Sequence, residues 1–158
     1  MSRIYDKMYV NHIKDVLRCY FHLKDTYKML LDENNELNDK IDRETLPKGI
    51  SYDREPSGVS TVNPTPYINE LILSQASVEK ELYMTERRIR HLEKDYKIKE
   101  MLSCLSADER SYFDLMYVSK LTTSSIAKVK GCSQQNAHKR CEYVIRKMAS
   151  LENNYSKR

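Results

Sequence analysis

Apolar side chains recur at alternating steps of three and four along residues 9–44, a stretch without proline or glycine. The repeating positions are Ile13, Val16, Tyr20, Leu23, Tyr27, Leu30, Asn34, Leu37 and Ile41. This spacing places all of these side chains along one side of an α-helix, as in a coiled coil. A single helix is too thin to bury such a stripe, so the pattern predicts a partner helix. Asn34 is the polar member, which lowers stability but penalises wrong registers when its amide has a partner.

The same alternation returns over residues 67–103, again without proline or glycine. Its positions are Ile68, Leu71, Gln75, Val78, Leu82, Thr85, Ile89, Leu92 and Tyr96. Two helices of nearly equal length predict an antiparallel hairpin in which each stripe buries the other. In one alignment Ile41 lies level with Ile68, and Asn34 then lies level with Gln75. Such a hairpin has a marginal core, which dimerisation through the same helices would complete.

We therefore interpret residues 1–103 as a long helical hairpin interrupted by a linker over residues 46–66. The linker contains all four prolines and two of the three glycines, so neither a helix nor a central strand can run through it. It is either a tether or an arm that contacts a partner, and the composition favours the tether. The candidate residues of the hairpin or oligomerisation seam are Tyr20, Tyr27, Asn34, Gln75, Leu82 and Ile89.

Residues 121–148 contain two short helical patterns on either side of a glycine. Thr122 or Thr123 can cap the first helix, and Gly131 can end it because glycine adopts the left-handed conformation at no steric cost. Ser133 is placed to cap the second helix. The apolar stripe of that helix comprises Ala137, Cys141, Val144, Ile145 and Met148. The layout is typical of a helix-turn-helix, so we predict a DNA-binding domain over residues 104–151 and a flexible tail over residues 152–158.

The stripe leaves polar side chains exposed at the front of the second helix. Their lengths suit contacts with base edges, and we identify four candidate base-reading residues: Gln134, Gln135, His138 and Lys139. Four others suit contacts with DNA phosphates: Thr123, Lys128, Lys130 and Arg140. Residues 121–158 carry 8 Lys and Arg against 2 acidic residues, whereas the rest of the chain has 19 against 21. The positive field therefore coincides with the proposed reading helix. A basic helix with a merely solvated face is the alternative.

The composition of the chain limits the classes of fold and of function that it can have. Charged residues make up 32% of the 158 residues, and there are 3 Gly, 4 Pro and no Trp, which favours an all-α fold. No apolar run approaches a membrane span, and the N-terminus lacks a hydrophobic signal core, so we expect a cytoplasmic protein. The four cysteines and four histidines show no metal-ligand spacing. Without a phosphate loop or a nucleophile motif, we expect no enzyme, no cofactor and no metal site.

One stretch of the chain resembles region 4 of bacterial sigma factors. The residues that carry the resemblance are Leu121-Thr122, Ile126-Ala127, Gly131-Cys132-Ser133 and Val144-Ile145-Arg146-Lys147-Met148, preceded by Leu105-Ser106-Ala107-Asp108-Glu109-Arg110 with Tyr112, Phe113, Leu115 and Tyr117. A helical half before such a module is similar to the sigma-like late-gene regulators of phages of Gram-positive bacteria, of the RinA and ArpU kind. The resemblance implies a phage protein that works in the host bacterial cytoplasm and contacts RNA polymerase.

Three functions are consistent with these features. The leading one is a sequence-specific, dimeric transcription regulator that binds double-stranded DNA. A phage small terminase subunit, which marks DNA for packaging, also joins a helix-turn-helix to long helices, and such proteins generally form rings. The third is an interaction protein whose C-terminal domain binds RNA polymerase or another regulator without contacting DNA.

Overall fold

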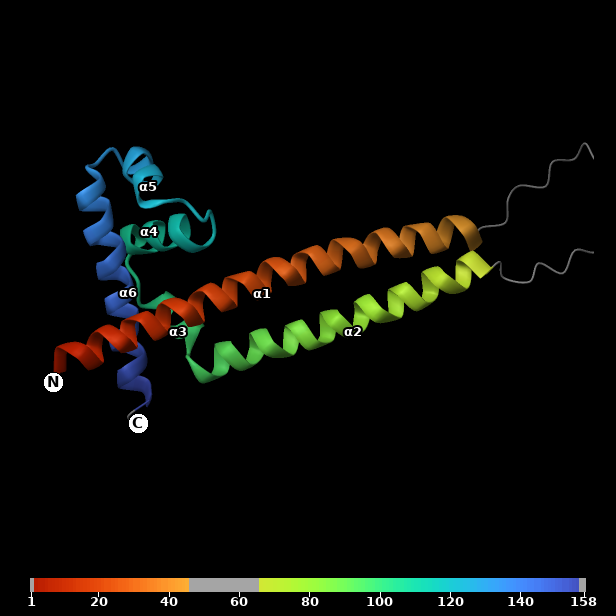
Figure 1. The fold of residues 1–158 in the computed structure, drawn as a ribbon, viewed down its shortest axis with the longest axis horizontal. Helices are drawn as coiled ribbons and strands as arrows, with labels where there is room; N and C mark the ends of the chain where they lie inside the picture. The colour runs from red at the N-terminus through yellow and green to blue at the C-terminus, as the bar shows by residue number, and fades with distance from the viewer. Residues whose placement is uncertain (1, 46–65, 157–158) are drawn as a thin grey trace, which may run out of the picture. The chain divides into compact units, whose positions relative to one another are not determined.

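The computed structural model describes residues 2–45 and 66–156, and within them the side chains of residues 7–45 and 66–152. All the regular structure in these ranges is helical, which confirms the all-α class (Figure 1). The helices are α1 (Ser2–Thr45), α2 (Pro66–Asp95), α3 (Ile98–Ser103), α4 (Ala107–Tyr117), α5 (Thr123–Lys130) and α6 (Gln134–Ser156). Apart from Pro66, which opens α2, the expected linker over 46–66 lies outside the described residues.

The chain divides into two compact units, and the division does not follow the expected boundary near residue 103. Unit 1 comprises Met1–Asp25 and Arg87–Arg158, and unit 2 comprises Thr26–Glu86. The N-terminal part of α1 and the C-terminal part of α2 therefore belong with the helices that follow them. The reason is that their apolar side chains share one hydrophobic core with α3, α4, α5 and α6.

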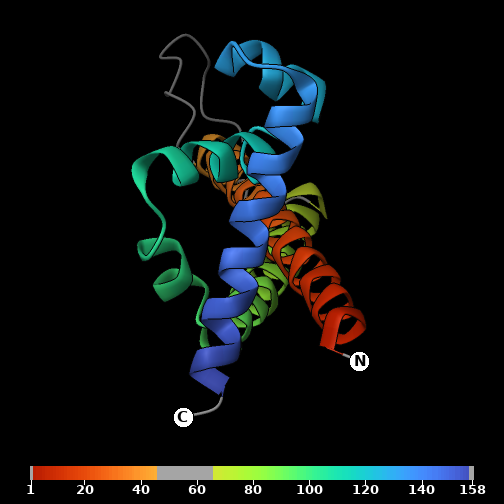
Figure 2. The ribbon, with the colours of Figure 1, turned by 90° about the vertical axis from the view of Figure 1, so that its left-hand side faces the viewer.

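The core of unit 1 is built against one side of α6. In Figure 2, α6 runs through the unit with α3 and α4 on one side and the N-terminal part of α1 on the other. The largest fully buried side chains come from five helices: Ile13, Leu17, Ile98, Met101, Phe113, Ile126, Val144 and Met148. Leu17 lies outside the three-and-four alternation of the sequence. It is buried because this part of α1 contacts several helices, which widens its apolar stripe.

The second long helix is shorter than the sequence predicts. A continuous helix over residues 67–103 is wrong, because α2 ends at Asp95 and α3 starts at Ile98. Between them Lys97 adopts the left-handed conformation, with φ of 50°. The break turns the chain so that Ile98 and Met101 become fully buried. The change of direction at Lys97 thus adds two apolar side chains to the core of unit 1.

The last helix is longer than the sequence predicts. The expected helix end near Leu151 is wrong, because α6 continues to Ser156. Glu152, which we assigned to a flexible tail, is a buried residue of α6. No glycine or proline follows Leu151 to stop the helix.

Within unit 2, parts of α1 and α2 lie side by side and bury few side chains. Its buried residues are Leu30, Leu71, Val78 and Thr85, and Tyr27 and Leu82 are half-buried. The expected pairing of Asn34 with Gln75 is wrong by one helical turn, because the Gln75 amide donates to Oδ1 of Asn38. Asn34 keeps its position in the seam, and its Oδ1 atom is buried without a hydrogen-bond partner.

Candidate nucleic-acid interface

Local signals in the sequence set the ends of α5. The Thr122 hydroxyl accepts a hydrogen bond from the Ser125 amide at 3.3 Å, which satisfies one of the free amides of the first turn. Gly131 ends the helix with φ of 61°, a conformation that costs other residues energy. Ser133 then accepts from the Asn136 amide at 3.2 Å at the start of α6. These caps confirm the expected turn over Gly131–Ser133.

The buried side of α6 fixes which of its side chains face water. The stripe that the sequence predicts is confirmed, because all five of its members are at most 6% exposed: Ala137, Cys141, Val144, Ile145 and Met148. Burial raises the pKa of the Cys141 thiol, which therefore remains a protonated core side chain. The opposite side of the helix is left to solvent.

A charged contact holds α6 against α4. The Ser106 hydroxyl accepts from the Glu109 amide, and the Glu109 carboxylate accepts from the Ser106 amide, forming a capping box at the start of α4. The same carboxylate pairs with Nζ of Lys147 on α6 at 2.6 Å. Hydrogen bonds from Lys147 and from the Ser106 backbone lower the pKa of Glu109. Lys147 is thus engaged within the fold.

The four candidate base-reading residues are all exposed at the front of α6. Gln134, Gln135 and His138 line one shallow hollow of about 470 Å³ together with Thr123 from the start of α5. Lys139 is exposed on α6 but does not line this hollow. His138 is 62% exposed, and its Nε2 atom lies 3.9 Å from the Glu142 carboxylate. The structure therefore brings both amides and the imidazole to one place.

The four candidate phosphate-binding residues have different surroundings. Thr123 is half-buried at the hollow, whereas Lys128 and Arg140 are exposed. Lys130 is only 21% exposed, because its ammonium group pairs with Asp108 at 3.2 Å. That group also lies 4.6 Å from the centre of the Tyr112 ring. Lys130 thus joins α5 to α4, a contact that depends on how the two helices pack.

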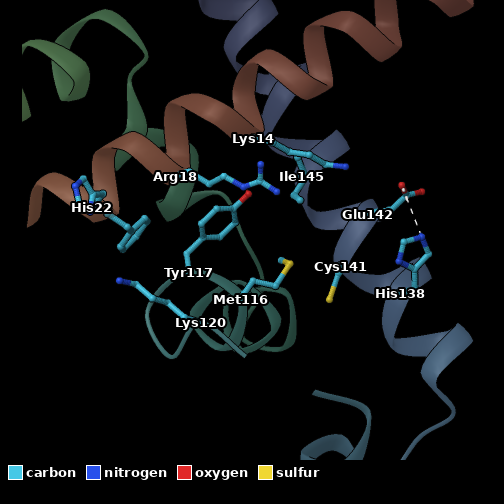
Figure 3. Close-up of a pocket in the computed structure, with 11 residues that line it drawn as sticks. Lys14, Arg18, His22, Met116, Tyr117, Lys120, His138, Cys141, Glu142 and Ile145 are labelled. Atoms are coloured by element: carbon cyan, nitrogen blue, oxygen red, sulfur yellow. Dashed lines mark ion pairs between the residues drawn. The ribbon is translucent and has the colours of Figure 1, made fainter. Parts of the chain in front are cut away.

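A second hollow, of about 430 Å³, lies beside the first and shares His138 with it. Figure 3 shows Lys14 and Arg18 projecting into it from the same side of α1, with Lys120 and Tyr117 opposite and His138 and Glu142 on α6. Burial raises the pKa of Tyr117 to about 12, so its hydroxyl stays protonated. Sequence reasoning missed this site because Lys14 and Arg18 lie far from α6 in the chain. Their spacing of four residues on the polar side of the seam was the available signal.

Charge is divided unevenly between the two units. Unit 1 contains 21 Lys and Arg against 11 Asp and Glu, which gives a net charge of +10. Unit 2 contains 6 against 12, which gives −6. The separation is sharper than the one visible when only residues 121–158 are counted. A polyanion is attracted to unit 1 and repelled by unit 2.

No protein-family model matches the chain, and comparisons with curated proteins and with solved structures find no match. Among the helices that the structure describes, none has the length and apolar character needed to cross a membrane. Within the same residues no group of His, Cys, Asp and Glu side chains could hold a metal ion. The four cysteines are free thiols.

Proposed function

We propose that the protein is a sequence-specific DNA-binding transcription regulator of the sigma-like phage type, in which α5 and α6 act as a helix-turn-helix. The observation that carries the proposal is the exposure of two glutamines, a histidine and a lysine at the front of a capped helix in a unit of net charge +10. The first turns of α6 enter the major groove. RNA polymerase is the partner that the resemblance to sigma region 4 implies.

Base reading falls to Gln134, Gln135, His138 and Lys139. A glutamine amide donates and accepts at once, which matches the edge of adenine, and a lysine donates to the acceptors of guanine. Lys128 and Arg140, which are exposed, contact phosphates, as does the Thr123 hydroxyl at the hollow. In this proposal Lys130 orients α5 through its contact with Asp108.

Dimerisation through unit 2 completes the proposal. Its three buried apolar side chains each retain 8% exposure, which is too little core for an independent pair of helices. Seven large apolar side chains of the unit are exposed: Met29, Leu31, Tyr67, Ile72, Leu73, Tyr83 and Met84. A second copy packed against unit 2 would bury part of this apolar area. The solution mass tests this step, and a large ring would instead favour a terminase subunit.

The test of base reading begins with selection of bound fragments from random duplex DNA. Gln135→Ala should then weaken binding to the selected site by about 1–3 kcal/mol and relax discrimination at one base pair. Lys128→Ala is the matched control, because loss of a phosphate contact weakens selected and random DNA alike. Equal losses on both DNAs for Gln135→Ala would refute the assignment of base reading. Absence of any salt-sensitive DNA binding by the wild type would refute the proposed function.

A further inference from the structure

The hollow beside the reading helix has a strongly cationic rim. Three of its lining residues are Lys or Arg, namely Lys14, Arg18 and Lys120, and they come from two different parts of the chain. Lys14 forms no ion pair with another described residue. His138 adds an imidazole at the border with the first hollow. An anion in this hollow would meet donors from both α1 and α6 (Figure 3).

The existing ion pairs of this rim are weak. Arg18 lies 3.5 Å from Asp15, and both side chains are more than 70% exposed. Lys120 pairs with Asp25, and these side chains are 60% and 52% exposed. Exposed pairs of this kind contribute about 0–1 kcal/mol, so a phosphate can take over the cation at little cost. Charge-assisted bonds from Arg to phosphate are among the stronger hydrogen bonds in proteins.

The hollow lies next to the part of α6 that enters the major groove in the proposed function. DNA read by Gln134 and Gln135 places sugar-phosphate backbone on each side of α6. The side of α6 that carries His138 and Glu142 faces the hollow. The floor is apolar, with Phe21, Met116 and Ile145, which suits the carbon atoms of deoxyribose.

We propose that Lys14 and Arg18 on α1 hold the DNA backbone beside the reading turn of α6, with the phosphate lying in the hollow that these residues share with His138. The inference rests on the proposed function and adds a second DNA-binding element from the N-terminal end of the chain. It also gives a reason for the N-terminal part of α1 to belong to unit 1. Two cations at this point steer the duplex and fix its register on α6.

A substitution of Glu142 should change DNA affinity in the opposite direction to the substitutions of Lys14 and Arg18. It is the only carboxylate among the described residues that line the hollow, and its oxygens lie 3.9 Å from His138 and 3.4 Å from Arg146. A phosphate in the hollow is repelled by this charge. Glu142→Gln removes the charge at nearly constant shape and releases the Arg146 guanidinium and the His138 imidazole for the DNA, so it should raise affinity.

The experiment measures binding of the full chain to a 20-base-pair random duplex by fluorescence anisotropy across a range of salt concentrations. Lys14→Gln and Arg18→Gln should each weaken binding roughly five- to tenfold at 0.1 M salt, and each should reduce the salt slope by about 0.9. Glu142→Gln should strengthen binding severalfold. Arg18→Lys, which keeps the charge, should recover most of the affinity. Lys28→Gln, an exposed change on α1 outside the hollow, is the control and should bind like the wild type.

The possible failures are distinguishable. A wild-type protein that does not bind DNA would refute the proposed function itself. If the wild type binds DNA and the variants Lys14→Gln, Arg18→Gln and Lys28→Gln all bind it with the same affinity, only the contact by α1 is refuted. Variants that lose binding of inorganic phosphate while keeping full DNA affinity would also refute that contact, because the hollow would then be a site for small anions. Hydrogen exchange of the α6 amides in each variant confirms that unit 1 is folded.

Discussion

Leu17→Ala tests whether the N-terminal part of α1 belongs to the same core as α6. The Leu17 side chain is fully buried and is part of the hydrophobic cluster of unit 1. The sequence alone placed this segment in a separate hairpin, where the residue would lie beside the seam. A large loss of stability in unit 1 is therefore expected only from the observed packing.

The magnitude follows from the burial of the side chain. The substitution removes three carbon atoms, and each buried methylene contributes about 0.8 kcal/mol, so the transfer contribution is roughly 2.4 kcal/mol. The remaining cavity adds to this, and the total expected loss is about 3–5 kcal/mol. Leu31→Ala is the matched control on the same helix, since Leu31 is 41% exposed in unit 2. The change in helix propensity is the same at both sites, and the control should cost less than about 1 kcal/mol.

Hydrogen exchange of the α6 amides provides the measurement, because it reports on unit 1 separately from unit 2. Leu17→Ala should lower the protection of these amides by several kcal/mol, whereas Leu31→Ala should leave it nearly unchanged. If the α6 amides were equally protected from exchange in the two variants, α1 would not be part of the core of unit 1. The same result would remove the physical basis for placing Lys14 and Arg18 beside α6.

Two further predictions concern the backbone and the charges of unit 1. Lys97→Gly should leave stability unchanged or raise it by up to about 1 kcal/mol, because glycine relieves the left-handed conformation. Lys94→Gly in the last turn of α2 should instead lower stability, by up to roughly 1 kcal/mol. Urea unfolding followed by circular dichroism measures both changes. The pKa of Glu109 is lowered in the folded state, so its contribution to stability is present above the unfolded pKa and is lost as the pH falls through the folded pKa. The wild type should therefore lose more stability than Glu109→Gln between about pH 5 and pH 3.

Each of these predictions has a contradicting result. A clear loss of stability in Lys97→Gly, equal to that in Lys94→Gly, would show that the helix is not broken at this point. Identical pH dependence in the wild type and in Glu109→Gln would show that the ion pair with Lys147 is not formed in solution.

The features that the sequence predicted are those set by neighbouring residues. Thr122, Gly131 and Ser133 act on amides and carbonyls within four positions of themselves, so their pattern is sufficient to place the ends of α5 and the start of α6. The stripe of α6 was equally readable, since one side of that helix faces a single core. These local signals also bring the candidate base-reading residues to one exposed surface.

The features that the sequence did not predict depend on contacts between distant segments. The break at Lys97 has no proline or glycine to mark it, and it is explained by the burial of Ile98 and Met101 in the core of unit 1. The periodicity excluded Leu17 because it assumed one partner helix for α1. The contact between Lys130 and Asp108 joins residues that are 22 positions apart in the chain, and no local pattern predicts it.

The two roles assigned to α1 can be separated in the Leu17→Ala variant. As part of the core, α1 affects DNA binding through the fraction of folded protein, which changes affinity but not the number of phosphates contacted. As a DNA-binding element, it affects binding through Lys14 and Arg18, and the loss of their contacts lowers the salt slope. A folded Leu17→Ala protein with the wild-type salt slope would show that packing tolerates the cavity without moving α1. A reduced slope would show that the core positions these two cations for the DNA.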